Sequence, residues 1–281
     1  MNNLSNLMLN RWIKRILFTV LTLYVIALGM LMLMENYLVY PGASTSRGNY
    51  DAEFEFEDVY FTASDGTKLH GWMIPYPESS RYVLYCHGNG ENVACAGNGV
   101  AKVMGDAMKA NVFVYDYRGY GKSAGESSET GIKLDTDAAM NWLCQRFGIK
   151  PTDVIVEGFS VGGGPAVYVG MKQGAKGLLL HRTFSSLPDV AAVKHPWAPV
   201  RLLMRNKFDS AALIADYNGP LLQSHGTIDQ VVPFKFGKKL HDACPSTDKQ
   251  FFTRPDMDHF SYVDPDFLDM ASQFADRLYG E

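Results

Sequence analysis

A serine between two glycines is the residue with the clearest chemical potential in this sequence. Ser160 lies at the centre of the stretch Gly158-Phe159-Ser160-Val161-Gly162. The β-branched residues of 153–157 predict a buried strand before it, and residues 165–169 predict the first turns of a helix after it. A sharp turn from strand to helix holds a serine hydroxyl in a strained, exposed position. The pattern therefore predicts a nucleophilic serine.

A serine hydroxyl is a weak nucleophile at neutral pH and needs a base, which in turn needs an acid to orient it. Asp229 follows the strand predicted at residues 220–225, and His259 follows the strand predicted at residues 250–253. Ser, then Asp, then His is the order in which one large class of hydrolytic enzymes carries these three groups. We predict that Ser160 is the nucleophile, His259 the general base and Asp229 the acid that orients it.

Each of these residues also has an ordinary structural interpretation. Ser160 could cap a helix, Asp229 could belong to a turn, and His259 could be a surface histidine. Asp256 and Asp258 are weaker candidates for the acid, because residues this close to His259 in sequence seldom reach its far ring nitrogen. We expect both of them to cap the loop.

Cleavage of an acyl group also requires two backbone donors for the oxyanion that forms on the substrate. One is predicted to be the N–H of Val161, directly after the serine. The other is predicted to be the N–H of Asn89, where the neighbouring Gly88 allows the backbone to be exposed. We interpret two further histidines, His87 and His225, as packing or supporting residues.

The elements around these residues alternate between apolar strands and helices. The strands are predicted at residues 54–61, 68–76, 82–86, 112–115, 153–157, 177–181, 220–225 and 250–253. The first two form an antiparallel hairpin. Helices at residues 93–108 and 128–147 separate later strands, and a further helix follows the last strand. This alternation predicts a mostly parallel sheet covered on both faces, with ligands bound at the carboxyl ends of its strands.

Length and composition limit the class of protein. The chain of 281 residues is long enough for one large α/β domain with an appendage. Its net charge of -4 gives no basic surface for nucleic acid. No His/Cys cluster has the spacing of a metal site, and no cofactor is required. We expect free thiols rather than disulfides, which stay an alternative, at four cysteines: Cys86, Cys95, Cys144 and Cys244.

Residues 16–34 contain no charged side chain and predict a membrane-spanning helix. At ~1.5 Å per residue they extend over roughly 28 Å, close to the hydrocarbon thickness of a bilayer. Arg11, Lys14 and Arg15 precede the run, which places the N-terminus in the cytoplasm and the main domain on the extracytoplasmic side. A cleaved signal peptide and a buried soluble helix are the alternatives.

The chain is thus expected to have three parts. Residues 1–40 form a transmembrane signal anchor, residues 41–53 a linker and residues 54–281 a catalytic domain. Residues 185–218 lie between the sixth and seventh strands and predict a small cap with two short helices. We expect its apolar residues to bind an acyl chain or to touch the bilayer.

Several of these motifs in this order resemble the α/β-hydrolase superfamily. Within it, the chain resembles the membrane-anchored α/β-hydrolase-domain-containing proteins, a branch that includes serine lipid hydrolases and protein depalmitoylases. The matching pieces are His87-Gly88-Asn89, residues 116–123, Gly158 to Gly162, Gly226-Thr227-Ile228-Asp229 with Val232-Pro233, and His259. The resemblance implies an eight-stranded sheet, a triad of Ser160, Asp229 and His259, and oxyanion donors at Val161 and Asn89.

We therefore expect a membrane-anchored serine hydrolase that cleaves carboxylic esters or thioesters. Its expected substrates are small-molecule or lipid-like esters, and the oligomeric state stays open. A serine peptidase or amidase on the same fold is one alternative, because it uses the same three residues. A catalytically silent scaffold at the membrane is the other, because a fold does not by itself define an activity.

Overall fold

Eight strands form one sheet at the centre of the molecule, in the order β1-β2-β4-β3-β5-β6-β7-β8. The computed structural model describes residues 2–43 and 48–280. β1 and β2 pair antiparallel, as do β2 and β4, and the other neighbours are parallel. The strands are β1 Glu57–Thr62, β2 Lys68–Ile74, β3 Tyr82–Cys86, β4 Asn111–Tyr115, β5 Val154–Phe159, β6 Gly177–His181, β7 Leu221–Gly226 and β8 Lys249–Arg254. The predicted eight-stranded, mostly parallel sheet is confirmed.

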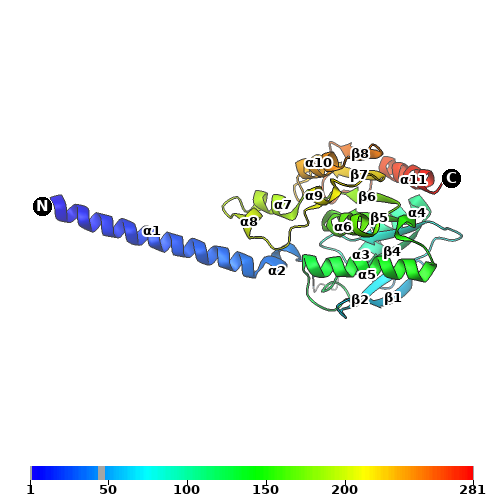
Figure 1. Ribbon diagram of the computed structural model, residues 1–281, viewed down its shortest axis with the longest axis horizontal. Helices are drawn as coiled ribbons and strands as arrows, with labels where there is room; N and C mark the ends of the chain where they lie inside the picture. Colours follow the sequence, from blue (N-terminus) through cyan, green and yellow to red (C-terminus); the bar gives the residue numbers. More distant parts are fainter. Residues whose placement is uncertain (1, 44–47, 281) are drawn as a thin grey trace.

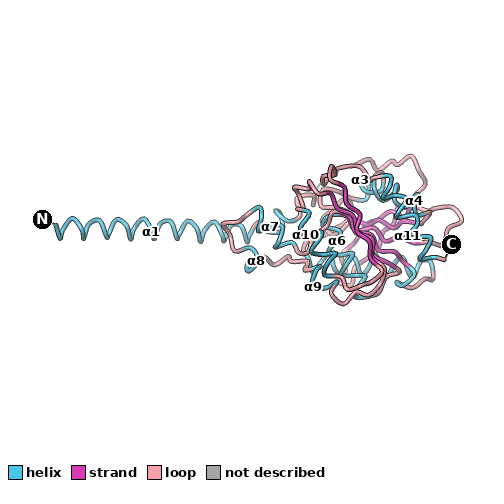
Figure 2. Tube along the Cα trace, turned by 90° about the horizontal axis from the view of Figure 1, so that it is seen from above, coloured by secondary structure: helices cyan, strands magenta, loops and turns pink. Residues whose placement is uncertain are grey.

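Helices cover both faces of this sheet, so its central strands are buried on both sides (Figures 1 and 2). One apolar core lies under α5 (Glu129–Phe147), α6 (Gly163–Gln173) and α10 (Phe234–Ala243). The other lies under α3 (Val93–Gly97), α4 (Val100–Met108) and α11 (Pro265–Tyr279). All five residues of β6 are buried, as expected for a run that alternates between two apolar layers.

The prediction of one helix over residues 93–108 is wrong, because α3 and α4 are separate. α3 ends at Gly97, where a Cβ atom would lie 2.7 Å from the Trp72 ring. The close packing of Trp72 on this turn and the following Asn98-Gly99 pair redirect the chain. Periodicity alone does not reveal such a break, because the apolar pattern continues across it.

The N-terminal helix α1 (Asn2–Leu33) projects away from the body (Figure 1). Its stretch Asn10–Leu33 is 24 residues long and apolar enough to cross a membrane. Length and composition of this kind also fit a signal sequence near an N-terminus.

A short helix, α2 (Glu35–Val39), joins α1 to the body and is held by the cap. The Glu35 carboxylate accepts hydrogen bonds from the backbone N–H groups of Arg205 (2.8 Å) and Asn206 (2.7 Å). The Tyr40 hydroxyl donates to the Asn206 side chain at 3.0 Å, and Tyr40 is buried. α2 therefore packs as part of the body. Of the predicted linker, residues 44–47 lie outside the described residues.

The cap lies between β6 and β7 and contains α7 (Leu187–Lys194), α8 (Val200–Leu203) and α9 (Ser210–Ile214). α7 and α8 lie at the end of the body where α1 joins it (Figures 1 and 2). α9, the third helix of the cap, packs against α6 and α10. The cap thus extends along the sheet edge that carries the carboxyl ends of the parallel strands.

Candidate active site

Ser160 lies directly after β5 in a turn that only small neighbours allow. Its φ of 53° is in the left-handed region, which is strained for a residue with a side chain. A Cβ atom at Gly158 would lie 2.5 Å from the carbonyl oxygen of Gly162. A Cβ atom at Gly162 would overlap the carbonyl of Cys86 at the end of β3. The motif thus requires both glycines, because at each of them another part of the backbone approaches too closely to leave room for a side chain.

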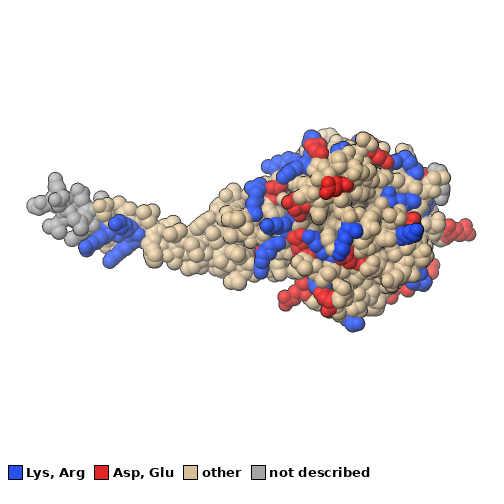
Figure 3. All heavy atoms as spheres, in the orientation of Figure 1, with Lys and Arg blue, Asp and Glu red and all other residues tan. Residues whose placement is uncertain are grey.

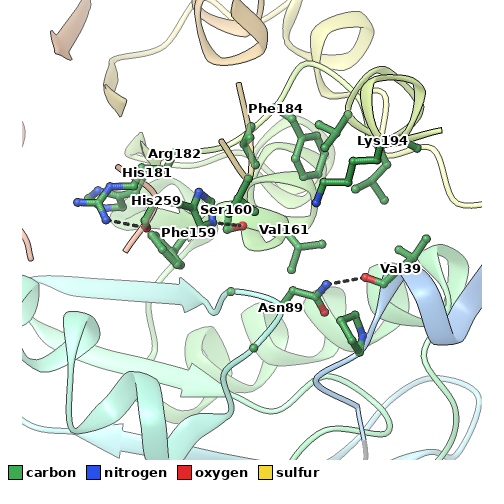
Figure 4. Close-up of a pocket in the computed structure, with 18 of the residues that line it drawn as sticks. Val39, Asn89, Phe159, Ser160, Val161, His181, Arg182, Phe184, Lys194 and His259 are labelled. Atoms are coloured by element: carbon green, nitrogen blue, oxygen red, sulfur yellow. Dashed lines mark hydrogen bonds between the residues drawn. The ribbon is translucent and has the colours of Figure 1, made fainter. Parts of the chain in front are cut away.

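The structure brings Ser160, His259 and Asp229 together in one hydrogen-bonded row (Figure 4 shows the first two). The Oγ of Ser160 lies 3.0 Å from Nε2 of His259. The opposite ring nitrogen, Nδ1, lies 2.7 Å from Oδ2 of Asp229. The three residues follow β5, β8 and β7, and all three are buried.

The carboxylate of Asp229 is held by several donors. Its Oδ1 accepts hydrogen bonds from the N–H groups of Val231 (2.9 Å) and Val232 (2.8 Å). Burial raises the pKa of Asp229, but hydrogen bonds with His225 and His259 outweigh burial and leave the pKa well below its ordinary range. An ionised Asp229 favours a proton on Nδ1 of His259, so that Nε2 presents its lone pair to the serine hydroxyl.

Arg182 holds the loop that carries His259, a role that the sequence analysis missed. Its guanidinium donates to the carbonyl oxygens of His259 (2.9 Å), Ser261 (2.7 Å) and Tyr262 (3.2 Å). Arg182 is buried, and this burial lowers the pKa of its guanidinium. The residue directly follows β6, and its place at a strand's carboxyl end is the one sequence signal for it.

A buried polar row lies beside the site. Nε2 of His181 is 2.8 Å from a carboxylate oxygen of Glu157, and its Nδ1 is 3.2 Å from the hydroxyl of Ser224. Burial raises the pKa of Glu157, more than the hydrogen bond from His181 lowers it. These hydrogen bonds between Glu157, His181 and Ser224 connect β5, β6 and β7 near their carboxyl ends. They fix the spacing of the strands that the site residues follow.

The two predicted oxyanion donors belong to residues that line the same pocket as Ser160 (Figure 4). Val161 follows the serine in the turn. Asn89 is fixed through its side chain, which donates to the carbonyl of Val39 at 2.6 Å and accepts from the Tyr120 hydroxyl at 2.5 Å. The expected packing role fits His87, because the centroid of its ring lies 4.1 Å from the centroid of the Tyr117 ring.

A pocket of about 650 Å³ opens above Ser160. Its walls come from the site loops, the cap, the end of the membrane-span candidate and the segment that follows it. Most of its lining is apolar, and Lys194 extends from α7 into it (Figure 4). Lining residues from α1 and α2 include Leu31, Met32, Leu38 and Val39, and those from the cap include Leu187, Val190, Val200 and Leu203.

The remaining candidates have structural roles. Asp258 accepts hydrogen bonds from Phe260 N–H (2.9 Å) and the Ser261 hydroxyl (2.8 Å), as expected for a loop cap. Asp256 lies two residues earlier in the same loop and is exposed. The four cysteines all lie in the described part of the chain, and none of them forms a disulfide there. In the described part of the chain, no group of three or more His, Cys, Asp and Glu side chains is arranged to hold a metal ion.

Known proteins resemble this chain in sequence and in fold. The sequence pattern of the alpha/beta hydrolase fold matches residues 82–201. YfhR of Escherichia coli K12 is 30% identical over 263 residues, which cover 89% of this chain and 88% of YfhR. The alpha/beta hydrolase domain-containing protein WAV2 of Arabidopsis thaliana is 30% identical over 232 residues, 74% of this chain and 75% of WAV2. The chain belongs to the alpha/beta hydrolase fold family.

A solved structure supports the same fold. The esterase Pf2001 of Pyrococcus furiosus superposes with a TM-score of 0.67 at 20% sequence identity, over 83% of this chain and 96% of that esterase. The predicted resemblance to this superfamily is therefore confirmed.

Proposed function

We propose that this protein is a serine hydrolase that cleaves carboxylic ester or thioester bonds of acyl or lipid-like substrates. The observation that carries the proposal is the row from the Ser160 hydroxyl through the His259 ring to the Asp229 carboxylate, at 3.0 Å and 2.7 Å. In this arrangement a base is within reach of the hydroxyl proton, and the base is itself oriented by an anion.

The proposed reaction runs in two halves. Nε2 of His259 takes the proton of Ser160 as Oγ attacks the carbonyl carbon, and the N–H groups of Val161 and Asn89 stabilise the oxyanion. His259 then donates the proton to the leaving alcohol or thiol, and an acyl-enzyme remains. Water, deprotonated by the same histidine, attacks this ester; the bond from the acyl carbon to Oγ breaks, His259 returns the proton to Ser160, and the acid is released. Asp229 steadies the imidazolium in both halves.

Two further observations support ester or thioester substrates. The pocket is mostly apolar, which suits an acyl chain better than a peptide with many polar groups. The protein of similar fold, Pf2001 of Pyrococcus furiosus, is an esterase, and this supports ester cleavage by analogy of fold. A peptidase or amidase stays the alternative within enzymes, and a silent membrane scaffold the alternative outside them.

We further propose that α1 is an uncleaved membrane anchor. Its apolar stretch ends where α2 docks onto the cap, so removal of α1 near this point would remove the part of the pocket wall formed by Leu31 and Met32. Arg11, Lys14 and Arg15 at its other end favour a cytoplasmic N-terminus and an extracytoplasmic catalytic domain. The proposed parts are the anchor at residues 1–40, the linker at 41–53 and the catalytic domain at 54–281.

The test is chemical. The parent protein and Ser160→Ala are treated with a fluorophosphonate and assayed on short p-nitrophenyl esters and matching amides. We expect labelling of the parent alone and a loss of turnover of roughly 10⁴-fold or more in the variant. Equal turnover by both proteins would exclude Ser160 as the nucleophile, and a folded parent that is neither labelled nor active would favour the scaffold.

A further inference from the structure

The cap contacts α1 well inside its membrane-span candidate. The Tyr24 hydroxyl donates to the carbonyl oxygen of Trp197 at 3.1 Å, and the two rings meet edge to face with centroids 6.3 Å apart. Tyr24 precedes Leu33, the last residue of the apolar stretch, by nine positions. At ~1.5 Å per residue this is about 14 Å of helix, close to the depth of one hydrocarbon leaflet.

We name residues 193–202, the part of the cap that contains Trp197, the cap tip. Three of its large apolar side chains are exposed: Val193 (48%), Trp197 (49%) and Leu202 (79%). Figure 3 shows that the visible face carries few charges from the basic end of α1 to the cap, and that basic side chains gather where the cap meets the body. An exposed apolar surface beside a membrane-spanning helix is the composition that a bilayer stabilises.

The charged and titratable groups of the cap tip do not oppose this placement. Lys194 and His195 line the pocket, and Figure 4 shows Lys194 directed into it. Arg201 pairs with Asp189 at 3.0 Å, and the same carboxylate also pairs with Lys239 at 2.8 Å. A basic side chain at this depth is tolerated when it is paired or turned toward a protein cavity.

The pocket continues from Ser160 to this same surface. Leu31 and Met32 at the end of α1 line it together with Val190 and Val200 of the cap. An acyl chain that lies in the leaflet can therefore pass between α1 and the cap without entering water. Burial of its methylene groups in the pocket replaces their burial in the bilayer, so entry costs little hydrophobic free energy.

From these contacts we infer that the cap tip is immersed in the leaflet next to the catalytic domain, and that the pocket takes ester lipids laterally from that leaflet. The inference rests on the proposed serine hydrolase and its membrane anchor. It commits to lipid acyl chains as the occupant of the cap tip, because the contact with Tyr24 places this surface beside a helix that spans the bilayer.

Immersion is tested without any activity measurement. The full-length protein is reconstituted in phosphatidylcholine vesicles, with and without lipids brominated on their acyl chains, and tryptophan fluorescence is compared with that of Trp197→Phe. We expect bromine to quench the parent more than the variant, whose other tryptophans serve as the background. Equal quenching of both proteins would overturn the inference, as would protection of Trp197 by a second copy of the chain at high protein density.

Lateral entry is tested with two esters that share one leaving group. One is a short-chain ester in water, and the other is a long-chain ester dissolved in the vesicle membrane. Leu202→Asp should lower turnover of the vesicle ester roughly tenfold or more, because a carboxylate in hydrocarbon is unfavourable. Turnover of the water-soluble ester should change by less than about twofold, as for other surface substitutions.

Val103→Asp is the matched control, because Val103 is exposed on α4, on the side of the body away from α1 (Figure 1). It should leave both esters unaffected. If Leu202→Asp changes neither ester, or both equally, entry from the leaflet is overturned. If the parent itself cleaves no ester and reacts with no fluorophosphonate, the proposed function fails, while the quenching result still decides whether the cap tip is immersed.

Discussion

The side chain of Asn89 donates a 2.6 Å hydrogen bond to the backbone carbonyl of Val39, the last residue of α2. The segment after the membrane-span candidate thus touches the loop to which we assign one oxyanion donor. Gly42 packs so closely on the same loop that a Cβ atom there would overlap the carbonyl of Asn89. With the Tyr120 hydroxyl on its other side, Asn89 is fixed between the body and the juxtamembrane chain.

Asn89→Ala keeps the backbone N–H of this residue but removes the contacts that orient it. We expect kcat on a soluble ester to fall roughly tenfold or more with little change in KM, because an oxyanion donor acts mainly in the transition state. Steady-state kinetics and a thermal melt measure this. Asn98→Ala is the control, since the Asn98 side chain likewise makes two hydrogen bonds, both to backbone carbonyls, but does not line the pocket. An unchanged kcat in Asn89→Ala would contradict the assignment.

The two aspartates near His259 can be told apart by substitution. Asp229→Asn should lower kcat roughly 10⁴-fold, because an amide at this position favours the wrong tautomer of His259. Asp258→Asn should retain nearly full activity, because the Asp258 side chain bonds the loop and is exposed. Rates of fluorophosphonate labelling and ester turnover measure both effects. A larger loss in Asp258→Asn than in Asp229→Asn would reverse the assignment of the acid.

Arg182 is predicted to position His259 through the loop rather than to touch the substrate. Arg182→Met removes the three donors that hold the carbonyls of residues 259, 261 and 262. Turnover should fall roughly tenfold to a hundredfold, since a small displacement of a catalytic base is costly. Arg182→Lys should not restore it, because one ammonium does not reproduce the planar fork of donors.

The control for Arg182 is Arg254→Gln, which removes a more exposed guanidinium that pairs with Asp264 at 2.7 Å. It should change turnover by no more than about twofold, in line with other surface ion pairs. Full activity of Arg182→Met with an unchanged melting temperature would show that the loop needs no such support.

The sequence allowed prediction of the features that depend on local pattern. Ser160, Asp229 and His259 could be placed at strand ends because apolar runs mark the strands and parallel strands end at one edge. Their order then indicated which three residues meet. The sheet followed from the same runs, whereas the break between α3 and α4 depends on the packing of Trp72 against Gly97, which no local pattern reveals.

Contacts between distant segments could not be predicted in this way. Arg182 and the His259 carbonyl are 77 residues apart, and Glu35 and Arg205 are 170 apart. A single glutamate after an apolar run is most simply interpreted as the exposed end of a membrane helix. Its burial depends on donors from the cap, and these are recognised only when the chain is folded.

The junction between the anchor and the cap should respond to acid through Glu35. Burial raises the pKa of its carboxyl, but hydrogen bonds from Asn206 and Arg205 outweigh burial and leave the pKa lowered. A lowered folded-state pKa means that folding favours the ionised form. This stabilisation is present above the ordinary glutamate pKa of ~4.3 and is lost as the pH falls through the folded-state value.

Glu35→Gln should therefore reduce the free energy of unfolding at pH 7 by roughly 2 kcal/mol, the order of a few charge-assisted hydrogen bonds. The difference from the parent should shrink as the pH falls below about 4, because the parent carboxyl then also becomes neutral. Thermal melts of both proteins in detergent across this range measure it. Glu55→Gln, at an exposed glutamate, should match the parent at every pH. A Glu35→Gln deficit that stays constant into acid would mean that the charge of Glu35 does not hold α2 to the cap.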